Sequence, residues 1–361
     1  MVNRKKRLFF LTAAAVLCLM AASCGSASDG FDGRMAEPPI TLLLKNNLPD
    51  ESITTKAVEW FSEQVEERTE GRVKIEVLNN ADMGDGRACL EQLQYGGTDI
   101  VKADVSALGN FVEEFNVLGM PYIYEGPEHF WAVHNGPIGE ELLRGAQMAE
   151  LGMYGLTYYD GGSRCFYSSR GEIHSPGDLE GLDVRVQQSE TALSMARALG
   201  ARPVTADYSE LYRTLQSKEA DAAENSIVNY YAQAFYEVAP YFTEDNHTRS
   251  ADVLVMSLES RKKLSEGDLL ILDKTAEESC EYQRKLWAEE EAAVREALLQ
   301  KNAVITQLTD SEYEAFRQVC EQIWYSYRDG RYIDLIDRIV AVGYLQKLPE
   351  QEGEIYESGS E

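Results

Sequence analysis

The chain has 361 residues, of which 61 are Asp or Glu and only 34 are Lys or Arg, so its formal net charge at pH 7 is −27. This excess of negative charge argues against nucleic acid or an anionic lipid surface as a binding partner, because both attract basic proteins. The six cysteines are widely spaced and include no Cys-x-x-Cys pair. Their spacing predicts no zinc site, and we expect buried free thiols rather than a disulfide framework.

The N-terminus has the three parts of a secretory signal peptide. Basic residues at positions 4–7 precede an apolar run over 8–20, and small residues then lead to Cys24. The run is shorter than the ~20 residues that a membrane-spanning helix needs. Small residues before a cysteine are typical of a lipoprotein signal, so we predict a signal peptide over 1–23 and lipidation of Cys24. Cys18, with bulkier neighbours, fits less well. Ordinary secretion with cleavage after Ser23 is the alternative, and both place the protein outside the cytoplasm.

Two flanking segments lack apolar periodicity. Residues 24–37, rich in Gly, Ser and Asp, predict a disordered tether, and residues 346–361 form an acidic tail. Removal of the signal peptide leaves 30 basic against 61 acidic residues. This charge would repel an anionic ligand at long range, so a local arginine cluster would have to capture it. Screening over ~8 Å at physiological salt makes such capture feasible.

The first block of the folded part alternates between strands and helices. Strands are predicted over Ile40–Lys45, Arg72–Leu78 and Thr98–Val101, and helices over Thr54–Arg68, Asp85–Gln94 and Gly126–Met148. Alternation of this kind, with short turns between the elements, predicts an α/β domain with a largely parallel sheet.

A second block repeats this pattern after Asp160-Gly161-Gly162, whose composition suits a hinge. The predicted elements around it are strands over Gly152–Tyr159, Gly181–Gln188, Ala220–Ala223 and Val253–Met256, another strand after Ala201, and helices over Glu190–Leu199 and Ser209–Ser217. We expect Glu224-Asn225-Ser226 to close the strand before it as a loop. A second domain therefore begins near Gly162.

The C-terminal third is helical. Ser265–Lys301 is an almost unbroken helical pattern, and a helix of ~35 residues would span ~50 Å and couple both domains. Glu312–Ile339 predicts two further helices. We predict domain I over 38–161 plus about 251–290, and domain II over 162–250 plus about 291–345.

Arg185 lies in the middle of a short β-branched strand. Val184 and Val186 flank it, so alternation places the valines on one face and Arg185 on the other. The planar guanidinium on a stiff strand suits bidentate capture of a carboxylate. The alternative is an ion pair with a neighbouring Asp or Glu in this acidic chain.

Motifs for catalysis or metal binding are missing from the sequence. It has no G-x-S-x-G elbow, no H-E-x-x-H and no P-loop lysine motif. The four histidines are isolated, and His129 and His134, five positions apart, do not share a helix face. Pairs of carboxylates occur by chance among 61 acidic residues, so they do not indicate a glycosidase.

From about Ile40 to about Tyr344, the chain resembles the solute receptors of tripartite ATP-independent periplasmic (TRAP) transporters, the C4-dicarboxylate-receptor-like (DctP-type) family. The segments that carry the resemblance, in the family's order, are 90–99, 115–122, 159–164, 178–186, 208–212, 222–225 and 235–238. The resemblance implies a two-domain α/β fold of the periplasmic-binding-protein kind (type II-like), with a long helix spanning both domains.

The resemblance also implies a ligand site. Arg185 matches the arginine that pairs with the ligand carboxylate, and Arg164 matches a second ligand arginine. Asn225, forty positions after Arg185, matches the family's asparagine, and Tyr208 a ring that lies against the ligand. The other expected ligand residues are Asn47 and Asp104 in the first domain, and Gln187, Glu224 and His247.

Local alternatives exist for several of these residues. Asn225 alone could form an Asx turn, Tyr208 could belong to the core, and Asp104 could be the N-cap of the following helix. Arg164 could pair with Asp160 or Glu172. Ser226 stands where the family often has proline, which predicts a less rigid loop over Glu224-Asn225.

The implied function is that of an extracytoplasmic, membrane-anchored receptor, not an enzyme, which needs no cofactor and no metal. As a monomer it would capture a small organic acid between two domains and deliver it to small and large TRAP membrane subunits driven by an ion gradient. Segments 185–190 and 222–226 are similar to those of members that bind hexuronates such as glucuronate or galacturonate. The alternatives are a C4-dicarboxylate, sialic acid or another acid, a ligand sensor without a permease, and a secreted enzyme.

Overall fold

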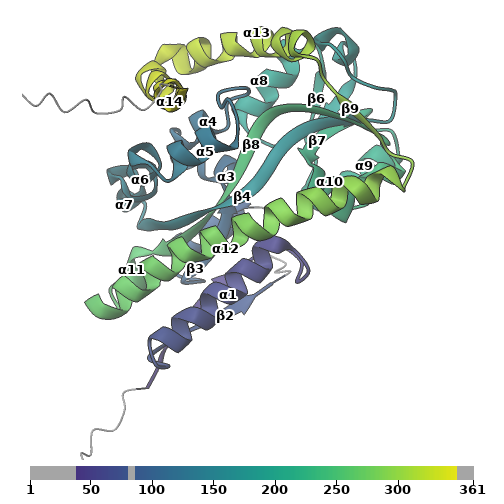
Figure 1. The fold of residues 1–361 in the computed structure, drawn as a ribbon. Coiled ribbons are helices and arrows are strands. Elements are labelled where there is room, and N and C mark those ends of the chain that lie inside the picture. Colours follow the sequence, from purple (N-terminus) through teal and green to yellow (C-terminus); the bar gives the residue numbers. More distant parts are fainter. Residues whose placement is uncertain (1–37, 80–85, 348–361) are drawn as a thin grey trace, which may run out of the picture. The chain divides into compact units, whose positions relative to one another are not determined.

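The computed structural model describes residues 38–79 and 86–347 (Figure 1). The predicted signal peptide, the tether, the lipidation site at Cys24 and nearly all of the acidic tail lie outside these residues. No helix in the described ranges is both long and apolar enough to cross a membrane.

The strands of the described chain form one mixed sheet. They are β1 (Ile40–Lys45), β2 (Val73–Leu78), β3 (Ile100–Asp104), β4 (Met153–Ser168), β5 (Asp183–Arg185), β6 (Arg202–Val204), β7 (Ala222–Ser226), β8 (Tyr241–Ser257) and β9 (Val304–Gln307). Their order is β2-β1-β3-β8-β4-β7-β5-β6, and β9 pairs with β8. The predicted α/β class is therefore confirmed. The loop expected over Glu224-Asn225-Ser226 is not formed, because these three residues are buried and belong to strand β7.

A largely parallel sheet was expected; five of the eight strand pairings among the described residues are parallel, and the three that are antiparallel all involve β4 or β8. β1 pairs in parallel with β2 and β3, and β5 with β6 and β7, but the pairs β3–β8, β4–β8 and β4–β7 are antiparallel. The reason is that β4 and β8 each run through both parts of the sheet. The chain crosses from one part to the other along β4 and returns along β8, so the two strands run in opposite directions.

The hinge-like Asp160-Gly161-Gly162 segment does not end a strand but forms a bulge within β4. The register with β8 shifts between Asp160 and Ser163. The carboxylate of Asp160 accepts the Gly162 N–H at 2.8 Å, and the Gln283 side chain binds both the N–H and the carbonyl of Asp160, each at 2.8 Å. The bulge keeps the strand continuous because these side chains satisfy the backbone groups that leave the ladder.

The helices before the long helix are short. They are α1 (Ile53–Arg68), α2 (Gly86–Gln94), α3 (Val105–Leu108), α4 (Phe115–Leu118), α5 (Pro127–His134), α6 (Pro137–Arg144), α7 (Ala146–Glu150), α8 (Glu190–Ala198), α9 (Leu211–Gln216), α10 (Ile227–Ala232) and α11 (Leu258–Arg261). The single helix predicted over Gly126–Met148 is three helices, because Pro137 starts a new helix and glycines 136 and 145 interrupt the pattern.

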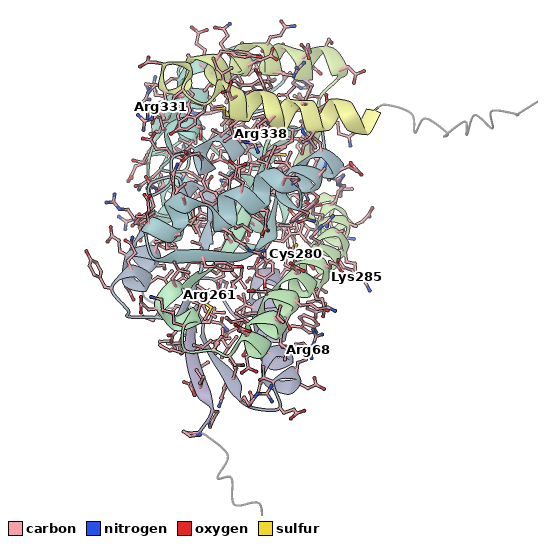
Figure 2. All side chains as sticks on the ribbon, turned by 90° about the vertical axis from the view of Figure 1, so that its left-hand side faces the viewer. Arg68, Arg261, Cys280, Lys285, Arg331 and Arg338 are labelled. Carbon is pink, nitrogen blue, oxygen red and sulfur yellow. The ribbon has the colours of Figure 1, made fainter. Side chains whose placement is uncertain are left out.

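The long helix α12 (Glu266–Leu299) confirms the helix predicted over Ser265–Lys301. It packs against α1 in one part of the fold and α10 in the other, and Figure 1 shows it lying along the whole sheet. Leu272 and Cys280 of α12 belong to the larger hydrophobic core, whereas Trp287 and Leu298 belong to the smaller one. Figure 2 shows two residues of α12: Cys280 lies in the interior of the molecule, and Lys285 lies at its margin. The helix thus contributes to both cores; the domain boundaries stay a prediction.

Two further helices, α13 (Asp310–Ser326) and α14 (Ile333–Lys347), follow β9. Figure 1 shows α13 over α8, and α14 on the side of α4 and α5. A short turn, η4 (Tyr327–Gly330), joins them. As expected, Cys89, Cys165, Cys280 and Cys320 are buried thiols that form no disulfide.

Candidate functional site

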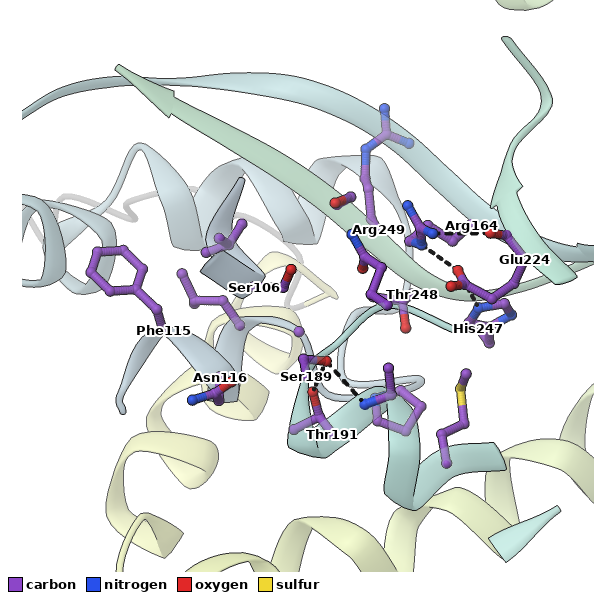
Figure 3. A pocket seen from close by; sticks show the side chains of 18 residues that line it. Ser106, Phe115, Asn116, Arg164, Ser189, Thr191, Glu224, His247, Thr248 and Arg249 are labelled. Atoms are coloured by element: carbon purple, nitrogen blue, oxygen red, sulfur yellow. Dashed lines mark hydrogen bonds and ion pairs between the residues drawn. The ribbon is translucent and has the colours of Figure 1, made fainter. Parts of the chain in front are cut away.

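A cleft opens where β5 and β7 end, opposite the helices that follow β3. Its lining comes from three places: α3 and α4 with the turn after them, the segment from Gln187 into α8, and the neighbouring strands β4, β7 and β8. The empty volume is about 530 Å³, a figure that includes space open to solvent. Figure 3 shows Arg164, Glu224 and His247 together at one end and Phe115 and Asn116 at the other.

Arg164 and Glu224 form a buried ion pair in this cleft. The Arg164 Nε donates to the Glu224 carboxylate, Nη2 donates to the Glu224 carbonyl at 3.0 Å, and Nη1 reaches Asn225 Oδ1 at 3.4 Å. Neither Asp160 nor Glu172, the partners considered from the sequence, pairs with Arg164. Glu224 keeps the pKa of Arg164 above its ordinary value, although burial opposes this.

His247 extends the ion pair into a network of four side chains. Its Nε2 lies 3.7 Å from Glu224 Oε2, and its Nδ1 lies 2.7 Å from Asp245 Oδ2. Burial would lower the pKa of His247, but Asp245 and Glu224 raise it to about 9. Burial would raise the pKa of Glu224, but Arg164 and His247 lower it to about 2. At neutral pH the network therefore balances two cations with two carboxylates.

Arg185 differs from Arg164 because it has no carboxylate partner among the described residues. Its Nε and Nη2 both donate to the Ala206 carbonyl, at 3.1 and 2.7 Å, and only 5% of the residue is exposed. Burial lowers the pKa of Arg185 below its ordinary value, and the charge of Glu224 offsets part of this. The ion pair with a neighbouring Asp or Glu, which was the alternative for Arg185, is therefore not formed within the described chain, and a buried guanidinium without a counter-charge is unusual.

Tyr167 is a neighbour of Arg185 that the sequence did not reveal. Arg185 on β5 pairs with Ala223 on β7, and Ala223 pairs with Tyr167 on β4. Directly paired residues project from the same face of a sheet, and the small Ala223 leaves space between the two long side chains. The buried Tyr167 hydroxyl has no hydrogen-bond partner within the described chain. No local pattern could show this, because it depends on the register of three distant strands.

Asn225 and Tyr208 lie near the two arginines. The Asn225 carbonyl oxygen accepts from the Ser226 N–H at 2.9 Å and from the Asn229 side chain at 3.2 Å, besides Arg164. Ser226 is the N-cap of α10, so the predicted loop over Glu224-Asn225 is replaced by a strand that leads directly into a helix. Tyr208 is 37% exposed and thus not core; burial of its hydroxyl raises its pKa to about 12, and Arg164 and Arg185 oppose this rise.

The remaining predicted residues lie in different surroundings. Gln187 lines the cleft. Asp104 caps α3, as the alternative had it, because its carboxylate accepts the Ala107 N–H at 3.0 Å and also the Ser106 hydroxyl. The side-chain oxygen of Asn47 is buried and has no partner in the described part of the chain. Ligand contacts for Asp104 and Asn47 stay predictions.

Several cleft residues were missed from the sequence. They share hydroxyl or amide groups, namely Ser106, Asn116, Ser189, Thr191 and Thr248. Such residues are common throughout a chain, so no sequence signal separates them from surface positions. In residues 38–79 and 86–347, no group of three or more His, Cys, Asp or Glu side chains could hold a metal ion.

Comparison with known proteins places this cleft in a class of solute receptors. The family model of bacterial extracellular solute-binding protein family 7 (DctP) matches residues 44–329. Because this match covers most of the chain, the protein belongs to the DctP family. Its members are solute-binding proteins found outside the cytoplasm.

Solved structures of TRAP periplasmic solute-binding proteins superpose well. One from Bradyrhizobium sp. BTAi1, in complex with galacturonate, is 31% identical, with TM-score 0.78 over 83% of this chain and 99% of that one. One from Chromohalobacter salexigens with bound D-glucuronate is 28% identical, with TM-score 0.78 over 84% and 99%. One from Sulfurospirillum deleyianum with bound succinate is 26% identical, with TM-score 0.77 over 84% and 99%. The protein has the two-domain fold of these receptors.

Proposed function

We propose that this protein is the extracytoplasmic receptor of a TRAP transporter, and that it captures a sugar acid with a single carboxylate, such as galacturonate or glucuronate. The observation that carries this proposal is the contrast between the two arginines. Glu224 already neutralises Arg164, whereas Arg185 is buried without a carboxylate. One unbalanced guanidinium calls for one ligand carboxylate, since desolvated charges must be paired.

The rest of the cleft suits the hydroxyl groups of a sugar. Ser106 and Asn116 on one side, and Gln187, Ser189 and Thr191 on the other, present hydroxyl and amide groups that both donate and accept hydrogen bonds. A second ligand carboxylate would meet the Glu224 and Asp104 carboxylates instead. A C4-dicarboxylate is thus the less favoured ligand, although the succinate-bound relative shows that the fold accommodates one in another chain.

The ligand is expected to act on a conformational equilibrium. Its carboxylate would bind Arg185 and Arg164, and its hydroxyl end would bind groups from the opposite side of the cleft, with Asn47 and Asp104 as further candidates. Contacts from both sides exist only when the cleft is closed, so the ligand shifts the population toward that state. The closed form would then deliver the acid to the small and large membrane subunits.

The receptor is further proposed to be anchored to the membrane by a lipid. Lipidation of Cys24 after removal of residues 1–23 would hold the receptor at the outer face of the membrane, as a monomer without enzymatic activity. A sensor that acts without a permease is the second candidate, and the genes beside this one would distinguish the two.

Calorimetry with galacturonate, glucuronate, succinate and sialic acid tests the proposal. We expect a uronate to bind at least tenfold more tightly than succinate, and a ligand at 100 times its Kd to add ~2.7 kcal/mol to stability in a thermal-shift screen. Arg185→Ala should weaken binding by at least about 30-fold, because a buried charge pair loses one partner. Arg197→Ala, an exposed arginine on α8, is the matched control. Tighter binding of succinate, or unchanged affinity in Arg185→Ala, would contradict the proposal.

A further inference from the structure

The turn between α13 and α14, with the two helices it joins, contacts elements on both sides of the ligand cleft. α13 packs against α8, which lines one side, and α14 packs against α5 on the other. His129 on α5 binds the Ile339 carbonyl at 2.7 Å, and Arg338 pairs with Glu141 at 2.6 Å. Arg331 and Arg338 are both labelled in Figure 2, in this C-terminal part of the chain. The two helices are therefore attached to opposite sides.

One side chain in this turn bridges the two sides directly. Arg328 Nη2 lies 3.2 Å from Glu113 Oε1 and 2.9 Å from Glu190 Oε2. Glu113 precedes α4, whose Phe115 and Asn116 line the cleft, and Glu190 is the first residue of α8, between the cleft residues Ser189 and Thr191. The guanidinium thus joins a carboxylate from each side.

Two more contacts hold Glu113 to the same turn. The Arg331 side chain lies 3.2 Å from Glu113 Oε2, and the Tyr332 hydroxyl donates to it at 2.9 Å. The two sides also lie close together, because α4 packs against α8 and even a Cβ added to Gly119 would lie 3.8 Å from Thr191 Oγ1. These contacts therefore belong to an arrangement in which the two sides are close.

The backbone of the turn is unusual as well. Arg328, Asp329 and Gly330 have φ values of 51°, 55° and 76°, so three consecutive residues are left-handed, and two of them carry a Cβ. Such conformations are unfavourable for residues other than glycine and persist where surrounding contacts compensate for them. The ion pairs of Arg328 are contacts of this kind.

We propose that Arg328, together with Glu113 and Glu190, is a clasp that holds the ligand cleft closed. Arg328 is a positioning residue: it does not touch the ligand but keeps α4 and α8 at the distance at which both sides contact it. Without Arg328, two carboxylates from opposite sides would face each other in a chain with net charge −27 and would favour opening. The effect on ligand binding rests on the proposed function; the effect on the distance between the two sides does not.

The clasp predicts a change in ligand release. These side chains are about 40% exposed, so each ion pair is weak and screened by salt. Arg328→Ala should therefore raise the dissociation rate of galacturonate about three- to tenfold, with a smaller effect in 1 M NaCl. Glu190→Gln in the Arg328→Ala background removes the repulsion and should restore part of the slow release, which a merely structural role of Arg328 does not predict.

Arg317→Ala is the matched control. Arg317 is on α13, the helix before the turn that holds Arg328. Its side chain is 38% exposed like that of Arg328, and it pairs with two glutamates, Glu314 at 3.3 Å and Glu321 at 3.2 Å. All three of these residues are on one helix, so the control removes the same chemistry without crossing the cleft. We expect its dissociation rate to equal that of the wild type.

A distance measurement tests the clasp without ligand. Spin labels at the exposed positions Ala149 on α7 and Ala198 on α8 would be read by pulsed resonance, with Cys18 and Cys24 replaced by serine, since the four cysteines of the described chain are buried. Arg328→Ala should broaden the distance distribution toward longer values, and Arg317→Ala should not. Should Arg328→Ala fold poorly, Glu190→Gln, which removes only the α8 contact, should give the same change to a smaller degree.

The outcomes separate the two proposals. If the wild type binds no uronate, the proposed function fails, and the distance distributions alone decide the clasp. If the wild type binds galacturonate but Arg328→Ala and Arg317→Ala share one release rate and one distance distribution, the clasp is wrong.

Discussion

The Arg164 guanidinium and the Glu224 carboxylate neutralise each other inside the ligand cleft, through a charge-assisted hydrogen bond and a second bond from Nη2 to the Glu224 carbonyl at 3.0 Å. Arg185 is not among the residues that line the cleft, and it is left without a carboxylate partner among the described residues. The number of carboxylates that the receptor accepts then depends on a protein side chain that was only a minor candidate from the sequence.

Removing the Glu224 charge should change ligand preference. In Glu224→Gln both Arg164 and Arg185 lack a carboxylate, so we expect the ratio of succinate to galacturonate affinity to rise at least about tenfold. The unfolding free energy should fall by about 3 kcal/mol, because one partner of a buried ion pair is lost. Calorimetry and urea unfolding measure the two effects. Asp183→Asn, which breaks the exposed pair with Arg202, is the control and should cost less than about 1 kcal/mol. An unchanged affinity ratio would show that Glu224 does not set the charge balance.

Arg185 and Arg164 should differ in what they contribute to stability. Arg185→Met removes a buried charge whose hydrogen-bond acceptor within the described residues is the Ala206 carbonyl alone. The unfolding free energy of the ligand-free protein should therefore stay equal or rise by about 1 kcal/mol. Arg164→Met leaves the Glu224 carboxylate buried with His247 alone, so a loss of about 3 kcal/mol is expected. Urea unfolding without ligand compares the two, and equal losses would mean that Arg185 has a partner in the free protein.

His247 should make stability fall at alkaline pH. Burial would lower its pKa, but Asp245 and Glu224 raise it to about 9 in the folded protein, against about 6.5 in an unfolded chain. A pKa that is higher in the folded state contributes stability that is complete below pH 6.5 and is lost as pH rises toward 9. The loss should be on the order of 3 kcal/mol. Urea unfolding at pH 6, 7.5 and 9 measures it, and His247→Gln should flatten the decline.

Glu224 should give the opposite dependence at acidic pH. Its pKa of about 2 lies below its ordinary value, because Arg164 and His247 outweigh burial. Its contribution is therefore complete above about pH 4.5 and is lost as pH falls toward 2. Unfolding of the wild type and Glu224→Gln between pH 5 and 2.5 should converge as the pH falls. Parallel curves would contradict the shifted pKa.

The bulge in β4 should tolerate no side chain at Gly162. A Cβ there would lie 2.9 Å from Ser226 Cβ and from the Trp287 ring, at a φ of +77°. Gly162→Ala should therefore lower the unfolding free energy by about 2–4 kcal/mol through steric overlap and backbone strain together. Gly71→Ala isolates the strain, because Gly71 has φ +76° with nothing within 4 Å of the added Cβ, and should cost only about 1 kcal/mol. Thermal and urea unfolding of both variants test this, and equal losses would show that packing at the bulge adds nothing.

Local patterns alone predicted much of the fold. A short apolar run marked β1 at its observed bounds, alternation marked β2 to within a residue, and unbroken helical periodicity marked α12 within a few residues. These patterns are carried by neighbouring residues, since a strand or helix buries one face at a fixed period. The order of motifs also led to Arg185, Arg164 and Asn225 as candidates.

What each side chain binds was decided only by the tertiary structure. Arg164 meets Glu224 sixty positions later, Arg185 meets the Ala206 carbonyl, and Tyr167 faces Arg185 across Ala223. The mixed direction of the sheet and the continuity of β4 through its bulge were likewise decided only by the tertiary structure. The physical reason is that strand register and side-chain pairing arise between segments far apart in the chain, where periodicity and residue type carry no information on the partner. The sequence by itself thus determined the elements and the candidate arginines. The packed fold determined which of the two arginines is neutralised by a carboxylate of the described chain, and which is left to pair with the carboxylate of a ligand.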